Sequence, residues 1–111
     1  GVGNVFNAPL RSGDGGSAFR EAMQSRILPS LRNFNPDIIL ISAGFDAHRD
    51  DPLASLELVE DDFMWITEQL LEIAEKQCDG RVVSMLEGGY DLQALARSVG
   101  VHVRMLMAAA G

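Results

Sequence analysis

The sequence predicts an α/β fold in which strands of a parallel sheet alternate with helices in the order βαβαβα. One observation is the segment DIILISA at residues 37–43, which is apolar on both faces, as is typical of a strand that helices cover on both sides. Another is the helical spacing of apolar residues before and after this strand. Helices of such lengths form the right-handed crossovers of parallel sheets, in which ligands bind beyond the carboxyl ends of the strands.

The amino-terminal third predicts one strand and one long helix. The strand is VGNVF at residues 2–6, and a glycine-rich loop, RSGDGGS at 11–17, follows it. Apolar residues at helical spacing then predict a helix over 18–34. Because Pro29 lies inside this helix and has no backbone N–H, we expect a kink or a break near Arg26.

The remaining elements follow the central strand in alternation. A helix over 60–78 begins with three acidic residues that complement its dipole, and Gly80 is suited to cap its end. RVVSML at 81–86 predicts the third strand, and the last helix covers 92–109. The loops after the second and third strands, and the loop at 7–16, are therefore expected at the carboxyl edge of the sheet.

Composition limits the classes of function. The chain of 111 residues suffices for one domain with one core, and its 47% hydrophobic content is typical of a globular protein. The net charge is −7 and the nine lysines and arginines are scattered, so we expect no nucleic acid partner. Cys78 is the one cysteine, which excludes an internal disulfide and leaves the compartment open, with the cytoplasm as the default expectation. The apolar runs are too short for a membrane span, and we expect no leader.

The loop after the central strand, SAGFDAHRDDPL at 42–53, contains residue types that bind metals. Asp46 and His48 are two positions apart, so in an extended segment both face the same way, and each is a good zinc ligand. In the alternative interpretation Asp46 accepts backbone hydrogen bonds and His48 is solvated. A structural zinc site needs about four ligands, and the sequence offers few others. Asp50 and Asp51 are expected to stabilise a bend.

The loop after the third strand, EGGYD at 87–91, contains paired glycines and the one tyrosine of the chain. Glycines allow a close approach of the backbone to a ligand or a positive φ, although a Gly-Gly pair fits many strand-to-helix turns. The Tyr90 phenol is a candidate donor to a developing oxyanion. Alternatively, Tyr90 is a half-buried aromatic residue that covers the end of the sheet.

Three motifs together resemble the carboxyl-terminal part of the histone deacetylase superfamily: NAPL at 7–10, SAGFDAHRDDPL at 42–53 and LEGGYDL at 86–92. This is the arginase-like group of zinc amidohydrolases, which includes acetylpolyamine amidohydrolases and acetoin-utilisation proteins. The residues of these motifs are more similar to the bacterial and class II-like branch of the superfamily than to the class I enzymes. The resemblance implies that residues 1–111 are the carboxyl-terminal part of a single, incomplete deacetylase domain with an arginase/deacetylase-like three-layer fold.

The resemblance assigns the acidic cluster to a zinc site. The aspartate of the family's Gly-Phe-Asp-Ala-His motif is a zinc ligand, which implies this role for Asp46, whereas the histidine two places later, here His48, is not a ligand. The family's other two zinc ligands, and its catalytic pair of histidines, precede the segment that matches here. We therefore expect Zn²⁺ as the cofactor, with its remaining ligands upstream.

The resemblance also implies a substrate tunnel and an oxyanion donor. Leu53 matches the leucine that lines the acyl-lysine tunnel, and Gly88 and Gly89 match the glycines that shape its floor. Tyr90 matches the tyrosine that polarises the scissile carbonyl. The implied reaction is zinc-dependent hydrolysis of an acetyl amide on a lysine- or polyamine-type amine, and the segment alone is expected to be inactive.

Two other interpretations stay open. The chain could be a non-catalytic α/β module for binding or assembly that retains the fold, or a small metal-binding domain that uses Asp46 and His48 together. Without the upstream strands the sheet edges would be exposed, which predicts either self-association into a homo-oligomer or dependence on the missing part of the domain. Val59 occupies the place where relatives carry a capping Ser or Thr, and the helix start is expected to be weaker by about 1 kcal/mol.

Overall fold

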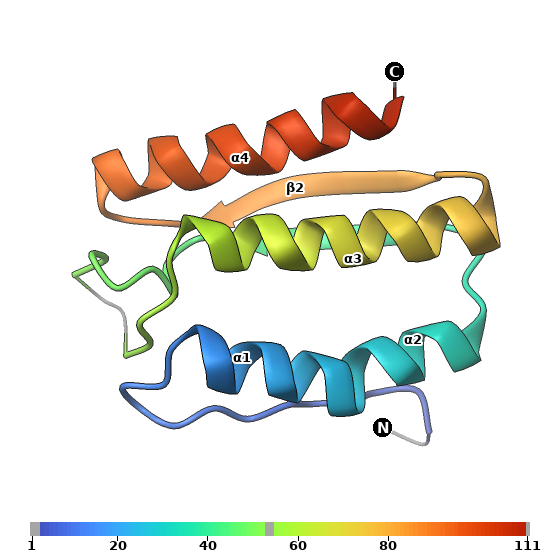
Figure 1. The fold of residues 1–111 in the computed structure, drawn as a ribbon, viewed down its shortest axis with the longest axis horizontal. Helices are drawn as coiled ribbons and strands as arrows, with labels where there is room; N and C mark the ends of the chain where they lie inside the picture. Colours follow the sequence, from blue (N-terminus) through green and yellow to red (C-terminus); the bar gives the residue numbers. More distant parts are fainter. Residues whose placement is uncertain (1–2, 53–54, 111) are drawn as a thin grey trace.

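The computed structural model describes residues 3–52 and 55–110. The elements in chain order are α1 (Gly16–Ala22), the π-helical segment η1 (Met23–Ile27), α2 (Leu28–Phe34), β1 (Ile39–Gly44), α3 (Glu60–Cys78), β2 (Val82–Gly88) and α4 (Leu92–Ala110). Figure 1 shows α3 running along the small sheet, with α4 on one side of it and the α1–α2 helix on the other. No helix in the described ranges is long and apolar enough to cross a membrane.

The two strands form a parallel pair, in register from Ile39 opposite Val82. This confirms the predicted parallel sheet and the crossover through a helix. The predicted first strand is wrong, because residues 3–6 form no strand and both Val5 and Phe6 are exposed. A short apolar run becomes a strand only when a neighbouring strand pairs with its backbone, and the sheet of the described residues contains β1 and β2 alone.

The first helix continues through its proline by changing its hydrogen-bonding pattern. The predicted kink near Arg26 takes the form of the π-helical segment η1, and Pro29 lies in the first turn of α2, where its missing N–H is tolerated. Leu28 beside it is 1% exposed and packs into the core. The π turn therefore allows one face of the helix to stay against its neighbours on both sides of the proline.

The main core lies between the helices and one face of the sheet. Its buried members are Leu28, Ile39, Ile73, Ala74 and Cys78.

The opposite face of the sheet is open. Leu40, Val83 and Met85 are 63%, 46% and 52% exposed, so the described helices cover one face only. The prediction from 37–43 that helices cover both faces is therefore not met within the described chain. An apolar strand pattern indicates that both faces of the strand are buried in the folded protein, but it does not show which segments bury them.

Hydrogen bonds satisfy backbone groups at both ends of helix α3. The side chain of Val59 cannot cap, but the Asp62 carboxylate accepts the Val59 backbone N–H at 2.9 Å, which is the reverse half of a capping box. At the other end Asp79 takes a left-handed conformation with φ of 55°, and the Gly80 N–H donates to the Ala74 carbonyl. Asp62 thus offsets part of the weakness expected at this helix start.

Candidate active site

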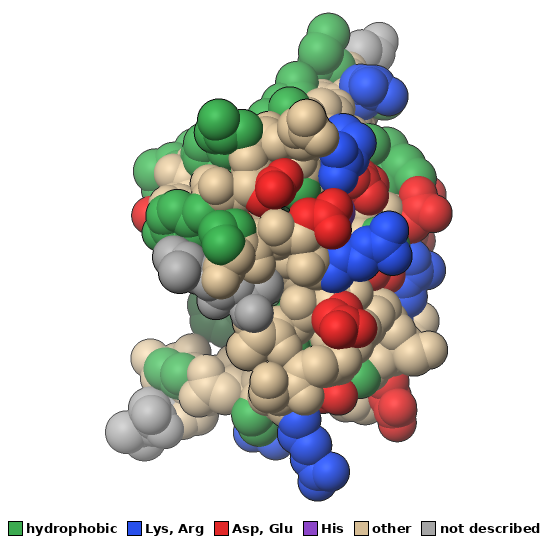
Figure 2. Space-filling model, turned by 90° about the vertical axis from the view of Figure 1, so that its left-hand side faces the viewer, with side chains coloured by type: hydrophobic (Ala, Val, Ile, Leu, Met, Phe, Trp, Pro, Cys, Tyr) green, Lys and Arg blue, Asp and Glu red, His purple; other side chains and the backbone are tan. Residues whose placement is uncertain are grey.

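The loops after β1 and β2 meet at the carboxyl edge of the sheet, as the sequence predicted. The Phe45 N–H donates to the Gly88 carbonyl at 2.8 Å, and the register slips between Ala43 and Gly44 because Gly44 pairs with Gly88. This bulge ends the regular ladder where the two loops begin, a position at which bulges often accompany functional sites. Figure 2 views this edge, where acidic and basic side chains alternate on one half and hydrophobic side chains gather on the other.

The glycine-rich loop near the amino terminus is connected to the same edge of the sheet by the segment at 57–58. Gly15 forms a parallel bridge with Glu57, and Leu58 forms one with His48. The Glu57 N–H donates to the Asp14 carbonyl at 2.8 Å, and the Leu58 N–H to the Ala47 carbonyl at 3.0 Å. Backbone hydrogen bonds therefore connect the amino-terminal loop to the loop after β1. The expected convergence of the three loops is confirmed.

The Asp46 carboxylate lies against two glycines. A Cβ atom at Gly44 would be 3.0 Å from its Oδ1 atom, and one at Gly88 would be 3.3 Å from its Cγ atom. Both glycines therefore leave space for the carboxylate at the ends of the two strands. Asp46 is exposed, and no residue of the described chain forms a hydrogen bond or ion pair with its carboxylate. An accessible carboxylate without a cationic partner fits a metal ligand.

His48 has a different environment from Asp46, and it is not solvated. It is 1% exposed. Its Nδ1 atom accepts the Asp50 backbone N–H at 3.1 Å, so in the neutral ring the proton is on Nε2, which lies 3.1 Å from Glu60 Oε1. Both ring nitrogens are engaged away from Asp46. This geometry supports the assignment of His48 as a neighbour of the site and disfavours a shared Asp46–His48 metal site.

An ion-pair network fixes the loop after β1 to two helices. Arg97 in α4 donates through Nε to Glu60 Oε1 at 2.5 Å and through Nη2 to Asp50 Oδ2 at 3.3 Å. The Arg97 hydrogen bond is the main cause that lowers the pKa of Glu60 to about 2. The network thus holds the loop that carries Asp46 at the amino-terminal ends of α3 and α4.

The Gly-Gly-Tyr motif requires glycine at its second position. Gly89 has a φ of 143°, and a Cβ atom there would be 2.7 Å from Leu95 Cδ1. Tyr90 is 56% exposed, so it does not cover the end of the sheet as a half-buried residue. Its side chain is available to a ligand. Asp91 then begins α4, because its Oδ1 atom accepts the Ala94 N–H at 2.8 Å.

Asp51 is the residue whose role the sequence did not reveal. It was expected to stabilise a bend, but it is 5% exposed and its Oδ2 atom accepts the N–H groups of Tyr90 and Asp91, at 2.5 and 3.3 Å. These bonds join the two loops directly. The available signal was a carboxylate in one loop and a glycine-rich loop with free N–H groups after the adjacent parallel strand.

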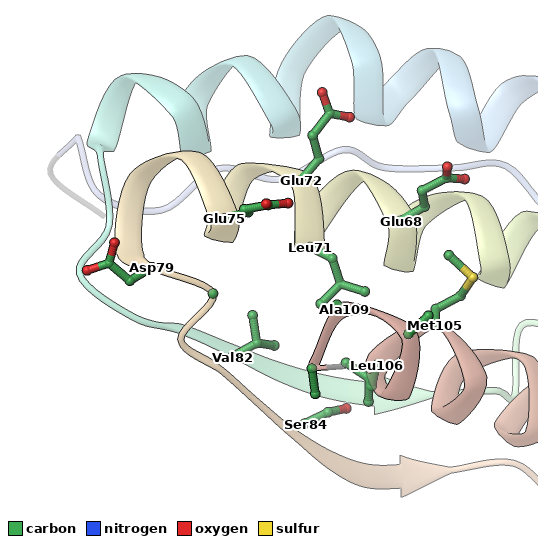
Figure 3. A pocket seen from close by; sticks show the side chains of 13 residues that line it. Glu68, Leu71, Glu72, Glu75, Asp79, Val82, Ser84, Met105, Leu106 and Ala109 are labelled. Atoms are coloured by element: carbon green, nitrogen blue, oxygen red, sulfur yellow. The ribbon is translucent and has the colours of Figure 1, made fainter.

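The predicted tunnel residue Leu53 lies outside the described residues. A pocket of about 910 Å³ opens at the opposite, amino-terminal end of the sheet. Figure 3 shows acidic residues of α3, including Glu68 and Glu72, above the apolar Leu106 of α4.

In residues 3–52 and 55–110 no three histidine, cysteine, aspartate or glutamate side chains form a group that could hold a metal ion.

Comparisons with known proteins identify the family of this chain. The model of the histone deacetylase domain matches residues 1–106. A chloroplastic histone deacetylase 10 of Oryza sativa subsp. japonica is 46% identical over 89% of this chain and 22% of its own length. A histone deacetylase-like amidohydrolase of Pseudomonas aeruginosa is 42% identical over 81% of this chain and 24% of its own.

Solved structures give the same result. The crystal structure of the HDA15 HD domain aligns with a TM-score of 0.84 at 33% identity, over 92% of this chain and 28% of that one. The chain spans between 6% and 30% of the length of the curated relatives described by these matches. The predicted α/β, deacetylase-like fold is confirmed, and the chain belongs to the histone deacetylase domain family.

Proposed function

We propose that the complete domain is a zinc-dependent deacetylase that hydrolyses the acetyl amide of an acetylated lysine or polyamine. The observation that carries the proposal is the meeting of the accessible Asp46 carboxylate with the Gly88–Tyr90 turn at the carboxyl edge of the sheet. The carboxylate would hold a metal ion, and that ion and a phenol on the adjacent strand end would both polarise the same amide carbonyl. The names of the matched relatives, deacetylases and amidohydrolases, support the same reaction class.

In this proposal Asp46 supplies one of the zinc ligands, and other parts of the complete domain supply the rest. When bound, the metal supplies Lewis-acid polarisation of the carbonyl and a lowered pKa of its bound water. Gly44 and Gly88 leave the carboxylate free to reach it, since a side chain at either position would contact its atoms. The ion-pair network of Arg97 and Glu60 holds the loop, and therefore the carboxylate, in place.

Tyr90 contributes a hydrogen bond to the oxygen that becomes negative in the tetrahedral intermediate. Its exposed phenol is not engaged with the described chain, so no internal bond must break before it donates. Loss of one such donor costs about 10²–10³ in rate, or roughly 2.7–4 kcal/mol of transition-state stabilisation. The substrate amine is expected to be held by parts of the domain beyond this chain, together with the glycines of the turn.

The test is an assay of the complete protein with acetyl-lysine peptides and acetylpolyamines. Asp46→Ala is expected to lose both zinc and activity, and Tyr90→Phe is expected to keep zinc and lose about 10²–10³ in kcat. Asp37→Ala is the matched control, because Asp37 is an exposed aspartate just before the opposite end of β1. A zinc-free protein without activity on any acetylated amine would contradict the proposal and favour a binding or assembly module.

A further inference from the structure

Asp51 and Tyr90 are 39 positions apart in the sequence, and their contact connects the two loops of the candidate site. The Asp51 side chain is buried, with 5% exposure, and one of its oxygens accepts two successive backbone N–H groups, those of Tyr90 and Asp91. Hydrogen bonds to an ionised acceptor are shorter and stronger than bonds between neutral groups. The Asp51 carboxylate is therefore a firm attachment point for the start of the Tyr90 segment.

The Tyr90 segment needs such an attachment. Gly88 ends β2 and pairs with Gly44, but Gly89 follows outside the strand, where glycine leaves the backbone free to adopt many conformations. Gly89 has a φ of 143°, which only glycine adopts readily, so the turn cannot be stiffened by a side chain at that position. On the other side, Asp91 caps α4 by accepting the Ala94 N–H. Asp51 thus fixes the backbone between Gly89 and the start of α4.

Asp46, the proposed zinc ligand, is on the same short loop as Asp51. Two turns make this loop compact, because the His48 N–H donates to the Phe45 carbonyl at 3.2 Å and the Asp51 N–H donates to the His48 carbonyl at 3.0 Å. A rigid loop that carries Asp46 at one end and holds the Tyr90 backbone at the other sets the distance between the two groups. A ring of contacts therefore connects the metal ligand to the oxyanion donor.

We propose that Asp51 is a positioning residue that holds Tyr90 at the catalytic distance from the metal bound by Asp46. The inference rests on the proposed function, because it gives Asp51 a task only if Tyr90 acts on the substrate. The bonds that Asp51 accepts from the Tyr90 segment come from backbone N–H groups, so we expect its removal to act on catalysis through the position of Tyr90. A displacement of a catalytic group by about 1 Å can cost about 100-fold in rate.

The experiment compares Asp51→Ala, Asp51→Asn and Asp37→Ala in the complete protein. Asp37→Ala is the matched control, since it removes an exposed carboxylate just before the opposite end of β1, outside the loops of the candidate site. We expect amide hydrogen exchange of residues 88–92 to become faster in Asp51→Ala and to remain as in wild type in Asp37→Ala. We expect kcat of Asp51→Ala to fall about 10- to 100-fold, with KM and zinc content changed little. Asp51→Asn keeps one oxygen acceptor and should lose less.

A double-mutant cycle separates positioning from a general loss of structure. In the Tyr90→Phe background, Asp51→Ala should cause little further loss of kcat, because the donor that it positions is already absent. Equal losses in both backgrounds, or unchanged exchange at 88–92, would overturn the proposal. If Asp51→Ala does not fold, the milder Asp51→Asn gives the same comparison. If Tyr90→Phe leaves kcat unchanged, the proposed function fails at Tyr90 and the positioning role fails with it.

Discussion

His102 connects three elements of the fold, and its replacement tests how the helices are held on the sheet. Its Nδ1 atom lies 2.8 Å from Thr67 Oγ1 in α3, and its Nε2 atom lies 2.8 Å from Ser84 Oγ in β2. The Thr67 hydroxyl donates to the Phe63 carbonyl at 2.7 Å, so it accepts from Nδ1–H, and Ser84 donates to Nε2. A neutral imidazole with its proton on Nδ1 satisfies all of these groups.

His102→Leu removes both side-chain hydrogen bonds while it keeps an apolar group in the buried position. A typical hydrogen bond contributes about 0.5–1.5 kcal/mol net, so two of them predict a loss of about 1–3 kcal/mol in the free energy of unfolding. Urea unfolding of the complete protein at pH 8, followed by circular dichroism, measures this loss. In a Thr67→Val background the loss should be smaller, since one of the two bonds is already absent.

The same residue predicts a pH dependence of stability. Burial lowers the pKa of His102 below its ordinary value of 6.5. As the pH falls below 6.5, the unfolded chain takes up a proton before the folded chain does, so stability decreases until the pH reaches the folded pKa. His102→Leu should remove this decrease. Wild-type stability at pH 8, together with a wild-type pH slope in the variant, would refute the role of His102.

Other predictions follow from the glycines and the ion-pair network. Gly88→Ala places a Cβ atom 3.3 Å from Asp46 Cγ, so the carboxylate must move. We expect zinc affinity, measured by competition with a chelator, to fall about 10-fold or more. Unchanged zinc affinity would show that Gly88 does not contribute to the metal site. Gly89→Ala should lower the free energy of unfolding by about 1–3 kcal/mol, because alanine is strained at a φ of 143°, while the tip of the Leu95 side chain, 2.7 Å from the added Cβ atom, can shift; an unchanged urea midpoint would contradict this. The bond from Arg97 lowers the pKa of Glu60 from 4.5 to about 2, so its stabilisation is complete above pH 4.5 and is lost as the pH falls toward 2. Glu60→Gln should flatten that part of the acid unfolding curve, and an identical acid slope would argue against the network.

The sequence predicted the elements whose pattern is local. The apolar strand at 37–43, the helix that begins at Glu60 and the last helix were expected within a few residues of their observed bounds. The predicted strand at 2–6 failed because pairing depends on a distant partner, about which a short apolar run carries no information. The π-helical turn before Pro29 was expected only as a kink. A proline in the sequence indicates that the helical hydrogen bonds are interrupted, but it does not show which hydrogen-bonding pattern replaces them.

In the candidate site, too, the sequence predicted local features better than contacts between distant segments. A positive φ was one of two explanations for the glycine pair at 88–89, and it is found at Gly89, because such a conformation is a property of a single residue. His48 and Asp51 could not be placed from their neighbours in sequence. Their partners, Glu60 and the Tyr90 backbone, are 12 and 39 positions away, so both looked like residues of a solvated turn. Contacts between loops of different strands depend on the complete fold.

The position of the metal in the complete protein tests the central claim most directly. Anomalous diffraction at the zinc edge, from crystals of the complete domain, would locate the ion without reference to activity. The proposal predicts a peak about 2.0–2.2 Å from an oxygen of Asp46, with His48 still bonded to Glu60. A peak at the His48 ring, or a zinc ion bound away from Asp46, would contradict the assignment of this loop to the catalytic centre.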